Sequence, residues 1–194
     1  TSGSDTNGQL GAGVINGNDT ISIGVNLSIG NTSGEGGIET SGGTNVITVT
    51  DAGSISTEGT AAHGIINNGD DNLTTMLGNI STSGDSSSGI NNYGGGNSTT
   101  VSGTISTSGE DSDGVWSGHG TGISNTVSVT GSITTTGDKS SGIEFYGATN
   151  SATISGTINS SGTDSSALRN QNGNGNSFQL NEGAIIIGDI LAIG

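Results

Sequence analysis

The chain has 194 residues, 39 of them glycine, and its 17 acidic residues against two basic ones give a formal net charge of −15. That charge excludes polyanionic nucleic acid and anionic membrane surfaces as favourable partners. The absence of cysteine excludes a disulfide framework and thiol chemistry. With 27% hydrophobic and 3% aromatic residues, the composition by itself is typical of a disordered linker.

The order along the chain contradicts that interpretation. Residues 1–12 are polar and predict an irregular lead-in, whereas residues 13–182 repeat a unit of about 25 residues whose clearest copy is 78–102. Residues 183–194 are apolar and predict a last coil, or a continuation toward a further C-terminal region. Their longest apolar run is far shorter than the roughly 20 residues that span a bilayer, so we expect no membrane insertion. Nothing resembles a signal peptide, and we expect the sequence to begin after any export signal.

Each repeat contains three short strand-like runs bounded by Gly, Asn, Asp or Ser. The first run carries a Gly-x-Ile pair, as at Gly103 and Ile105. The second begins with a glycine and an aliphatic residue 11 positions after the first glycine, as at Gly114 and Val115. In the third, an asparagine is followed four residues later by an apolar residue. Three runs per period without helical periodicity predict an all-β fold, a single-stranded parallel β-helix (β-solenoid) of about seven coils with three short strands per coil.

Two sets of polar residues recur at fixed positions in this register. Alternation along the first strand places a threonine inward in four successive coils, and we expect the buried hydroxyls to bond to one another along the stack: Thr57, Thr82, Thr107 and Thr135. The asparagine of the third run lies at a turn, where its amide can bond to the asparagine one coil away. This predicts a structural ladder of Asn45, Asn72, Asn97, Asn125, Asn150 and Asn176.

Residues suited to catalysis are few. Only His63 and His119 could act as bases near neutral pH, and neither lies in a Ser or Asp arrangement typical of a triad. Carbohydrate-cleaving sites need carboxylates with basic residues, and the chain offers only Lys139 and Arg169. We therefore interpret the histidines as loop residues and predict no enzyme, no catalytic residue and no cofactor.

Carboxylates also recur, in the turn between the first and second strands: Glu35, Glu58, Asp85, Glu110, Asp111, Asp138 and Asp164. Such a column can hold calcium loosely, or it can be a solvated face that prevents aggregation. The second interpretation is favoured, and no metal site is predicted.

The residue after the second anchor changes its chemistry at every coil: Glu39, Ile66, Asn91, Trp116, Glu144 and Arg169. The other outward columns are monotonous Ser and Thr, so this one indicates either recognition or free variation of exposed positions. Around it lie Tyr93, Tyr146 and an insertion at 117–124 that contains His119. If this face binds, we expect glycans or a partner protein, with Trp116 and Tyr146 as stacking surfaces. The register also predicts that Glu144 and Arg169 are neighbours on adjacent coils, an exposed pair worth about 0–1 kcal/mol.

Three motifs carry a family resemblance. Gly-x-Ile-x-Thr-x-Gly at 103–109, Ser-Gly-Ile at 88–90 and Asn-Ser-Thr-Thr-Val-Ser-Gly at 97–103 resemble passenger domains of bacterial autotransporters, over about residues 13–190. The resemblance implies a right-handed parallel β-helix, exported across the outer membrane of a Gram-negative bacterium and then displayed or released, often for adhesion. Residues 176–190 are similar to the segment where such passengers approach their barrel, although no barrel, protease or esterase motif is recognisable.

Three functions follow as hypotheses. The first is a non-enzymatic extracellular or outer-membrane surface protein, structural or adhesive, that binds glycans or host surface proteins. The second is a filament subunit that self-associates end to end through strand edges and the apolar tail. The third is an ice-binding protein, suggested by outward Thr and Ser ladders such as Thr100-x-Ser102.

Overall fold

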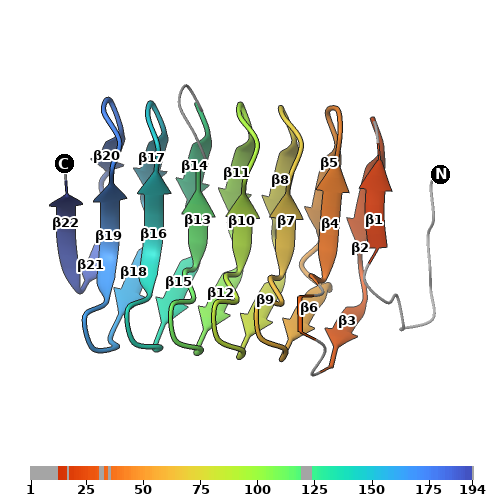
Figure 1. The fold of residues 1–194 in the computed structure, drawn as a ribbon, viewed down its shortest axis with the longest axis horizontal. Coiled ribbons are helices and arrows are strands. Elements are labelled where there is room, and N and C mark those ends of the chain that lie inside the picture. The colour runs from red at the N-terminus through yellow and green to blue at the C-terminus, as the bar shows by residue number, and fades with distance from the viewer. Residues whose placement is uncertain (1–12, 17, 31–32, 35, 119–123, 194) are drawn as a thin grey trace.

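The computed structural model describes residues 13–16, 18–30, 33–34, 36–118 and 124–193. Its strands stack into a column with the described ends of the chain at opposite ends of the long axis (Figure 1). Every strand pairs in parallel with the equivalent strand of the next coil, in three sheets that we name A, B and C. The predicted β-solenoid of about seven coils with three strands per coil is therefore confirmed.

Each coil contributes one strand to each sheet. Sheet A contains β1 (Gly13–Asn16), β4 (Ile38–Ser41), β7 (Ile65–Asn67), β10 (Ile90–Asn92), β13 (Val115–Ser117), β16 (Ser141–Tyr146), β19 (Ser166–Gln171) and β22 (Asp189–Ile193). Sheet B contains β2 (Thr20–Ile23), β5 (Val46–Val49), β8 (Leu73–Met76), β11 (Ser98–Val101), β14 (Thr126–Val129), β17 (Ser151–Ile154) and β20 (Ser177–Leu180). Sheet C contains β3 (Asn26–Ile29), β6 (Ser54–Thr57), β9 (Asn79–Thr82), β12 (Thr104–Thr107), β15 (Ser132–Thr135), β18 (Thr157–Ser160) and β21 (Ile185–Ile187).

The core runs the length of the column, because each inward aliphatic residue packs on its equivalent in the next coil. In sheet C, the isoleucines of the Gly-x-Ile motif are paired in register and at most 1% exposed: Ile55, Ile80, Ile105, Ile133 and Ile158. Burying one such side chain stabilises the fold by roughly 1.5–3 kcal/mol. One aliphatic residue per strand per coil thus gives a glycine-rich chain a continuous core.

The inward threonines are buried as predicted, but their predicted bonding to one another is wrong. The hydroxyls of Thr57 and Thr82 donate to the backbone carbonyls of Ala62 and Ser87, at 2.5 Å in both cases. Thr107 repeats the contact with Ser112, while Thr135 donates to Ser160 Oγ, one coil away, at 2.9 Å. The turn that follows each strand brings a buried carbonyl within reach, and that acceptor must be satisfied.

The asparagine ladder is present and lies along one edge of sheet B. The backbone N–H of each asparagine from Asn45 to Asn150 donates to Oδ1 of the asparagine in the next coil, at 2.7–3.1 Å. In two steps the side-chain amide donates to the same oxygen, from Asn45 to Asn72 and from Asn72 to Asn97. The ladder residues other than Asn176 are at most 1% exposed, so these bonds satisfy buried groups at a turn.

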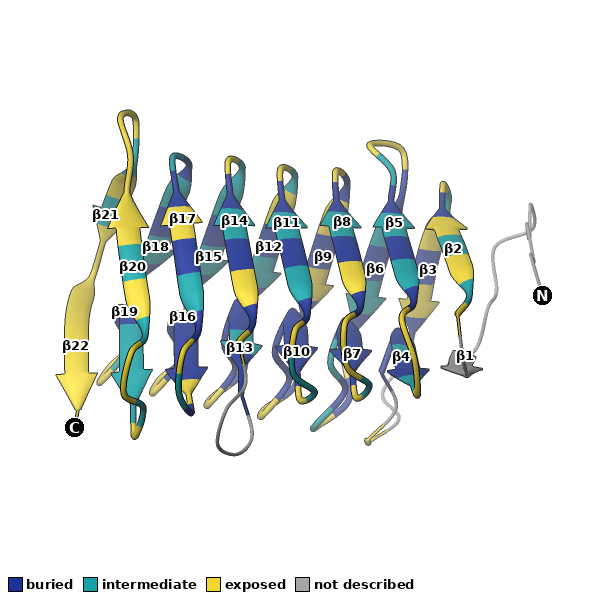
Figure 2. Ribbon diagram, turned by 90° about the horizontal axis from the view of Figure 1, so that it is seen from above, coloured by how far each residue is buried: buried dark blue, intermediate teal, exposed yellow. Residues whose placement is uncertain are grey.

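The last coil differs from the coils before it. Ile185, Ile187 and Ile190 are more than half exposed, and Figure 2 shows β22 exposed along its whole length. At the other end of the column, Ile23 and Leu27 are at most 4% exposed. The described part of the chain contains no helix long and apolar enough to cross a membrane.

The outer face of sheet B carries the polar ladder suggested for ice binding. Its central outward column consists of Ser22, Thr48, Thr75, Thr100, Ser128, Thr153 and Gln179. Beside it Leu73 and Leu77 are exposed, at 40% and 45%. Ice binding stays a prediction, to be tested by a thermal-hysteresis assay in which absence of activity would exclude it.

A groove on the outer face of sheet A

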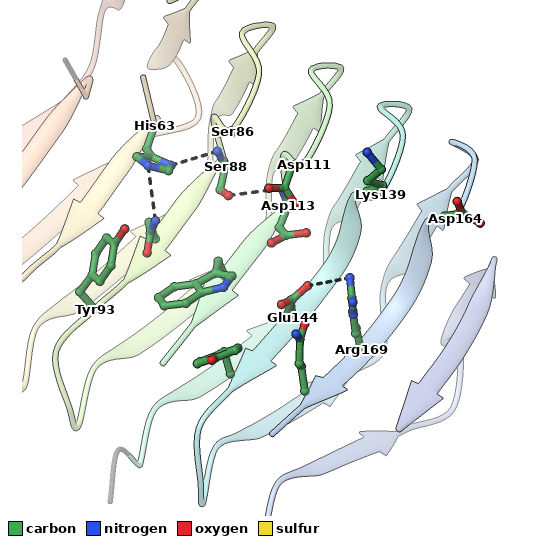
Figure 3. A pocket seen from close by; sticks show the side chains of 14 residues that line it. His63, Ser86, Ser88, Tyr93, Asp111, Asp113, Lys139, Glu144, Asp164 and Arg169 are labelled. Atoms are coloured by element: carbon green, nitrogen blue, oxygen red, sulfur yellow. Dashed lines mark hydrogen bonds and ion pairs between the residues drawn. The ribbon is translucent and has the colours of Figure 1, made fainter. Parts of the chain in front are cut away.

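A groove of about 780 Å³ runs along the outer face of sheet A, across the strands from β10 to β19 (Figure 3). Its floor is the column that follows the second anchor, in which Asn91 pairs with Trp116, Trp116 with Glu144, and Glu144 with Arg169. These pairings confirm the predicted register. Ile66 and Glu39 continue the column toward the N-terminal end but do not line the groove.

The expectation that this column is an exposed face is wrong. Asn91 is 4% exposed, Glu144 7% and Ile66 8%. The turns that precede the sheet A strands and the aromatic residues that follow them line the groove beside this column. The Glu144–Arg169 pair is therefore a partly buried one, to which the energy of an exposed pair does not apply.

One wall of the groove is aromatic. The Tyr93 and Trp116 rings have centroids 5.1 Å apart and planes inclined by 51°, and the Trp116 and Tyr146 rings are 6.3 Å apart with planes inclined by 22°. The three rings come from three successive coils, and Trp116, which belongs to the floor, packs against both tyrosines of the wall. Tyr93 and Tyr146 are 38% and 37% exposed, so the wall presents both apolar ring surface and phenol hydroxyls to the groove.

The opposite wall is the turn between sheets C and A. Ser86, Asp111, Lys139 and Asp164 occupy the same position in four successive coils and share a left-handed backbone, with φ between 55° and 57°. Aspartate tolerates this conformation, whereas for lysine it costs about 1–2 kcal/mol. Lys139 forms a salt bridge with Glu110, a turn residue of the preceding coil that does not line the groove.

Asp113 lies at the foot of this wall, 7% exposed. Its Oδ1 accepts a hydrogen bond from the Ser141 backbone N–H at 2.6 Å, and its own N–H donates to Ser88 Oγ at 3.2 Å. No salt bridge reaches it from the described residues. Burial, reinforced by the nearby charge of Glu144, raises the pKa of Asp113 well above its usual range.

Glu144 lies one coil further along the floor. Its Oε2 is 3.6 Å from an Arg169 Nη atom and accepts a hydrogen bond from Ser141 Oγ at 3.3 Å. Burial raises the pKa of Glu144, and the Arg169 guanidinium opposes that rise. Two neighbouring carboxyl groups thus differ in environment, since only Glu144 has a cation beside it.

His63 lies at one end of the groove, and its imidazole ring is neutral at pH 7. Burial lowers its pKa to about 4, and its Nδ1 accepts the Ser88 N–H at 3.0 Å. The ring proton is therefore on Nε2, which lies 3.5 Å from the Asn91 side-chain amide. Asn91 Oδ1 has no hydrogen-bond partner among the described residues. If the amide turns, Oδ1 meets the ring proton and Nδ2 is left unpaired instead, so in either orientation one polar atom of this buried amide lacks a partner.

The structure brings together most of the predicted binding residues, namely Asn91, Tyr93, Trp116, Glu144, Tyr146 and Arg169. Glu39 lies outside the groove, where it accepts a hydrogen bond from Asn68 at 2.6 Å. His119 and most of the insertion lie outside the described residues.

Sequence reasoning missed the wall residues Asp113 and Ser88 and placed His63 merely in a loop. A signal was available, because the position before the second anchor also changes along the chain: His63, Ser88, Asp113, Ser141 and Ser166. This variation was overlooked because only the residues that follow the second anchor were assigned to the inner or outer face of the strand.

Two carboxylates of the turn column accept hydrogen bonds from the backbone of the next coil. Asp85 Oδ1 accepts the Glu110 N–H at 3.0 Å, and Asp138 Oδ1 accepts the Thr163 N–H at 2.7 Å, each from the next coil. Within the described residues, no three or more His, Asp or Glu side chains are grouped so as to hold a metal ion.

No family model, no curated protein and no solved structure matches this chain. An elongated, partly apolar groove with an amide, a carboxyl group and a guanidinium on its floor can hold an extended polar ligand along the column.

Proposed function

We propose that this chain is an extracellular surface protein, of the autotransporter-passenger type, whose groove binds a glycan. The parallel coils and the repeated motifs at 88–90 and 97–109 support that origin. The observation that carries the binding function is the alignment of Tyr93, Trp116 and Tyr146 along a groove floored by polar side chains. Aromatic rings pack on the C–H faces of sugars, while amide and carboxyl groups bond to hydroxyls.

The spacing of the coils suits such a ligand. Parallel strands are about 4.8 Å apart, close to the length of one hexose unit in an extended polysaccharide. Each sugar of a glycan lying along the groove would therefore contact the residues of one coil. Because the groove crosses β10, β13, β16 and β19, it would hold a short oligosaccharide.

The test is a binding screen on oligosaccharides of four to six sugars, followed by calorimetry on those that bind. Trp116→Ala should weaken binding about tenfold or more, because it removes the central ring of the wall. Leu77→Ala is the matched control, since Leu77 is 45% exposed but does not line the groove. Absence of any glycan ligand, or equal binding by the Trp116 variant, would overturn the proposal.

End-to-end self-association is a second candidate function, supported by the exposed last coil. Ile185, Ile187 and Ile190 are more than half exposed beside the open edges of β20, β21 and β22. Electron microscopy of purified protein should then show fibres one solenoid wide, and Ile187→Asp should abolish them. Particles that stay single at high concentration would exclude this candidate.

A further inference from the structure

The groove contains more negative charge than its own cations balance. Four carboxyl groups line it against two cationic side chains, and one of those cations, Lys139, is engaged by Glu110 outside it. Arg169 faces Glu144. Asp111, Asp113 and Asp164 therefore line the groove without a salt bridge to any described residue.

Asp113 is the most informative of these residues. Asp113 is 7% exposed, lines the groove and forms no salt bridge with any described residue. Leaving a buried carboxylate without a counter-charge is costly, and a cation placed in the groove would supply that charge. Burial raises the pKa of Asp113, as expected for a carboxyl group that lacks such a partner.

The aromatic wall favours the same kind of ligand. The faces of Tyr and Trp rings carry negative potential, so a cationic group held within about 6 Å of a ring centroid is attracted to it. Tyr93, Trp116 and Tyr146 lie in the same groove as the unpaired carboxyl groups. The net charge of −15 adds a long-range attraction for cations and repels acidic sugars.

A buried polar side chain with an unpaired atom also borders the groove. The Asn91 amide is 4% exposed, lines the groove and keeps one polar atom without a partner among the described residues. Buried amide atoms are normally satisfied, and a sugar hydroxyl can donate to or accept from this one.

We propose that the glycan bound in this groove carries ammonium groups, as a polymer of 2-amino sugars does, with the ammonium lying between the aromatic wall and the carboxyl groups of Asp111, Asp113 and Asp164. This inference rests on the proposed function and names the ligand class of the same groove. A neutral glycan would use only the rings and the hydroxyl contacts, and an acidic glycan would be repelled.

The test compares two ligands that differ only in charge, the β-1,4-linked glucosamine hexamer and its fully N-acetylated counterpart, by calorimetry at pH 6. The amino hexamer should bind the intact chain about tenfold tighter or better. Raising the salt from about 0.05 M to 0.5 M should reduce that advantage, because the carboxylates of Asp111 and Asp164 are exposed.

Two variants test the contribution of charge without changing the fold. The double substitution Asp111→Asn and Asp164→Asn preserves side-chain shape, and asparagine tolerates the left-handed backbone at both positions. It should remove most of the preference for the amino hexamer, so that the two hexamers bind the double variant with similar affinity. Glu58→Gln, an exposed residue of the same turn column that does not line the groove, should preserve the preference.

The outcomes separate the two proposals. Equal or tighter binding of the N-acetylated hexamer would overturn the ammonium inference while glycan binding stands. Binding of neither hexamer, nor of any glycan in the screen, would overturn both proposals. Binding of the amino hexamer that survives in the double variant and in Trp116→Ala would show non-specific attraction to an acidic protein, and would overturn the site.

Discussion

Glu144 and Arg169 are paired residues of β16 and β19, and their charged groups approach to 3.6 Å in a groove where the two side chains are only 10% and 23% exposed. Arg169 is thus the charged partner of a carboxyl group that burial disfavours as an anion. Its removal would leave Glu144 without compensation.

Arg169→Gln should lower the free energy of unfolding by about 1–3 kcal/mol at pH 7, because Glu144 loses its charged partner. The loss should shrink at pH 4, where Glu144 can take up a proton. Urea unfolding at both pH values measures the effect, and Glu144→Gln combined with Arg169→Gln should restore part of the loss. A loss that is equal at both pH values would contradict this account.

Asp113→Asn should stabilise the protein, increasingly so as the pH rises. The pKa of Asp113 is raised in the folded state, so above about pH 4 the folded state binds more protons than the unfolded state and stability falls with rising pH. Asparagine has no charge to bury, and its Oδ1 can still accept the Ser141 N–H. Denaturant unfolding of both proteins at pH 5 and pH 8 should show the difference growing with pH. A variant that is less stable at pH 8 would contradict it.

His63 should give the opposite dependence in an acidic window. Its pKa is lowered to about 4 by burial, so between about pH 6.5 and pH 4 the unfolded state binds more protons and stability falls as the pH falls. Over this range the free energy of unfolding should fall by about 3 kcal/mol at most. His63→Gln should remove this dependence. Unfolding curves of the two proteins at pH 7, 5.5 and 4.5 should then show the difference between their free energies of unfolding becoming smaller as the pH falls.

Asn97→Ala should be among the most destabilising single changes in the ladder. Asn97 Oδ1 accepts two bonds from Asn72, at 2.8 Å from the backbone and 3.0 Å from the side chain, and all these groups are buried. Leaving two buried donors unpaired costs about 2–4 kcal/mol. Asn176→Ala is the comparison, because Asn176 is half-buried near the last coil, and thermal melts should show a clearly smaller decrease.

The repeat period sufficed to predict the coil, the core and the ladder, because stacking gives equivalent positions the same environment. Glu144 and Arg169 could be paired from the sequence for this reason. The hollow between the walls could not be predicted, because it depends on how far the turn at Asp111 and the ring of Tyr146 extend from the sheet, which no local pattern records. Asp113, by contrast, directly precedes the second anchor at Gly114, so the repeat register was enough to place it beside the column.

The floor of the groove receives one side chain from each coil, and this has a consequence for how the protein can change over generations. Duplication or loss of one 25-residue unit, such as 78–102, would lengthen or shorten the trough by one rung of about 4.8 Å while preserving every contact within the remaining coils. The length of the groove and the chemistry of its floor can therefore evolve independently, the first by recombination between repeats and the second by point substitution in a single coil.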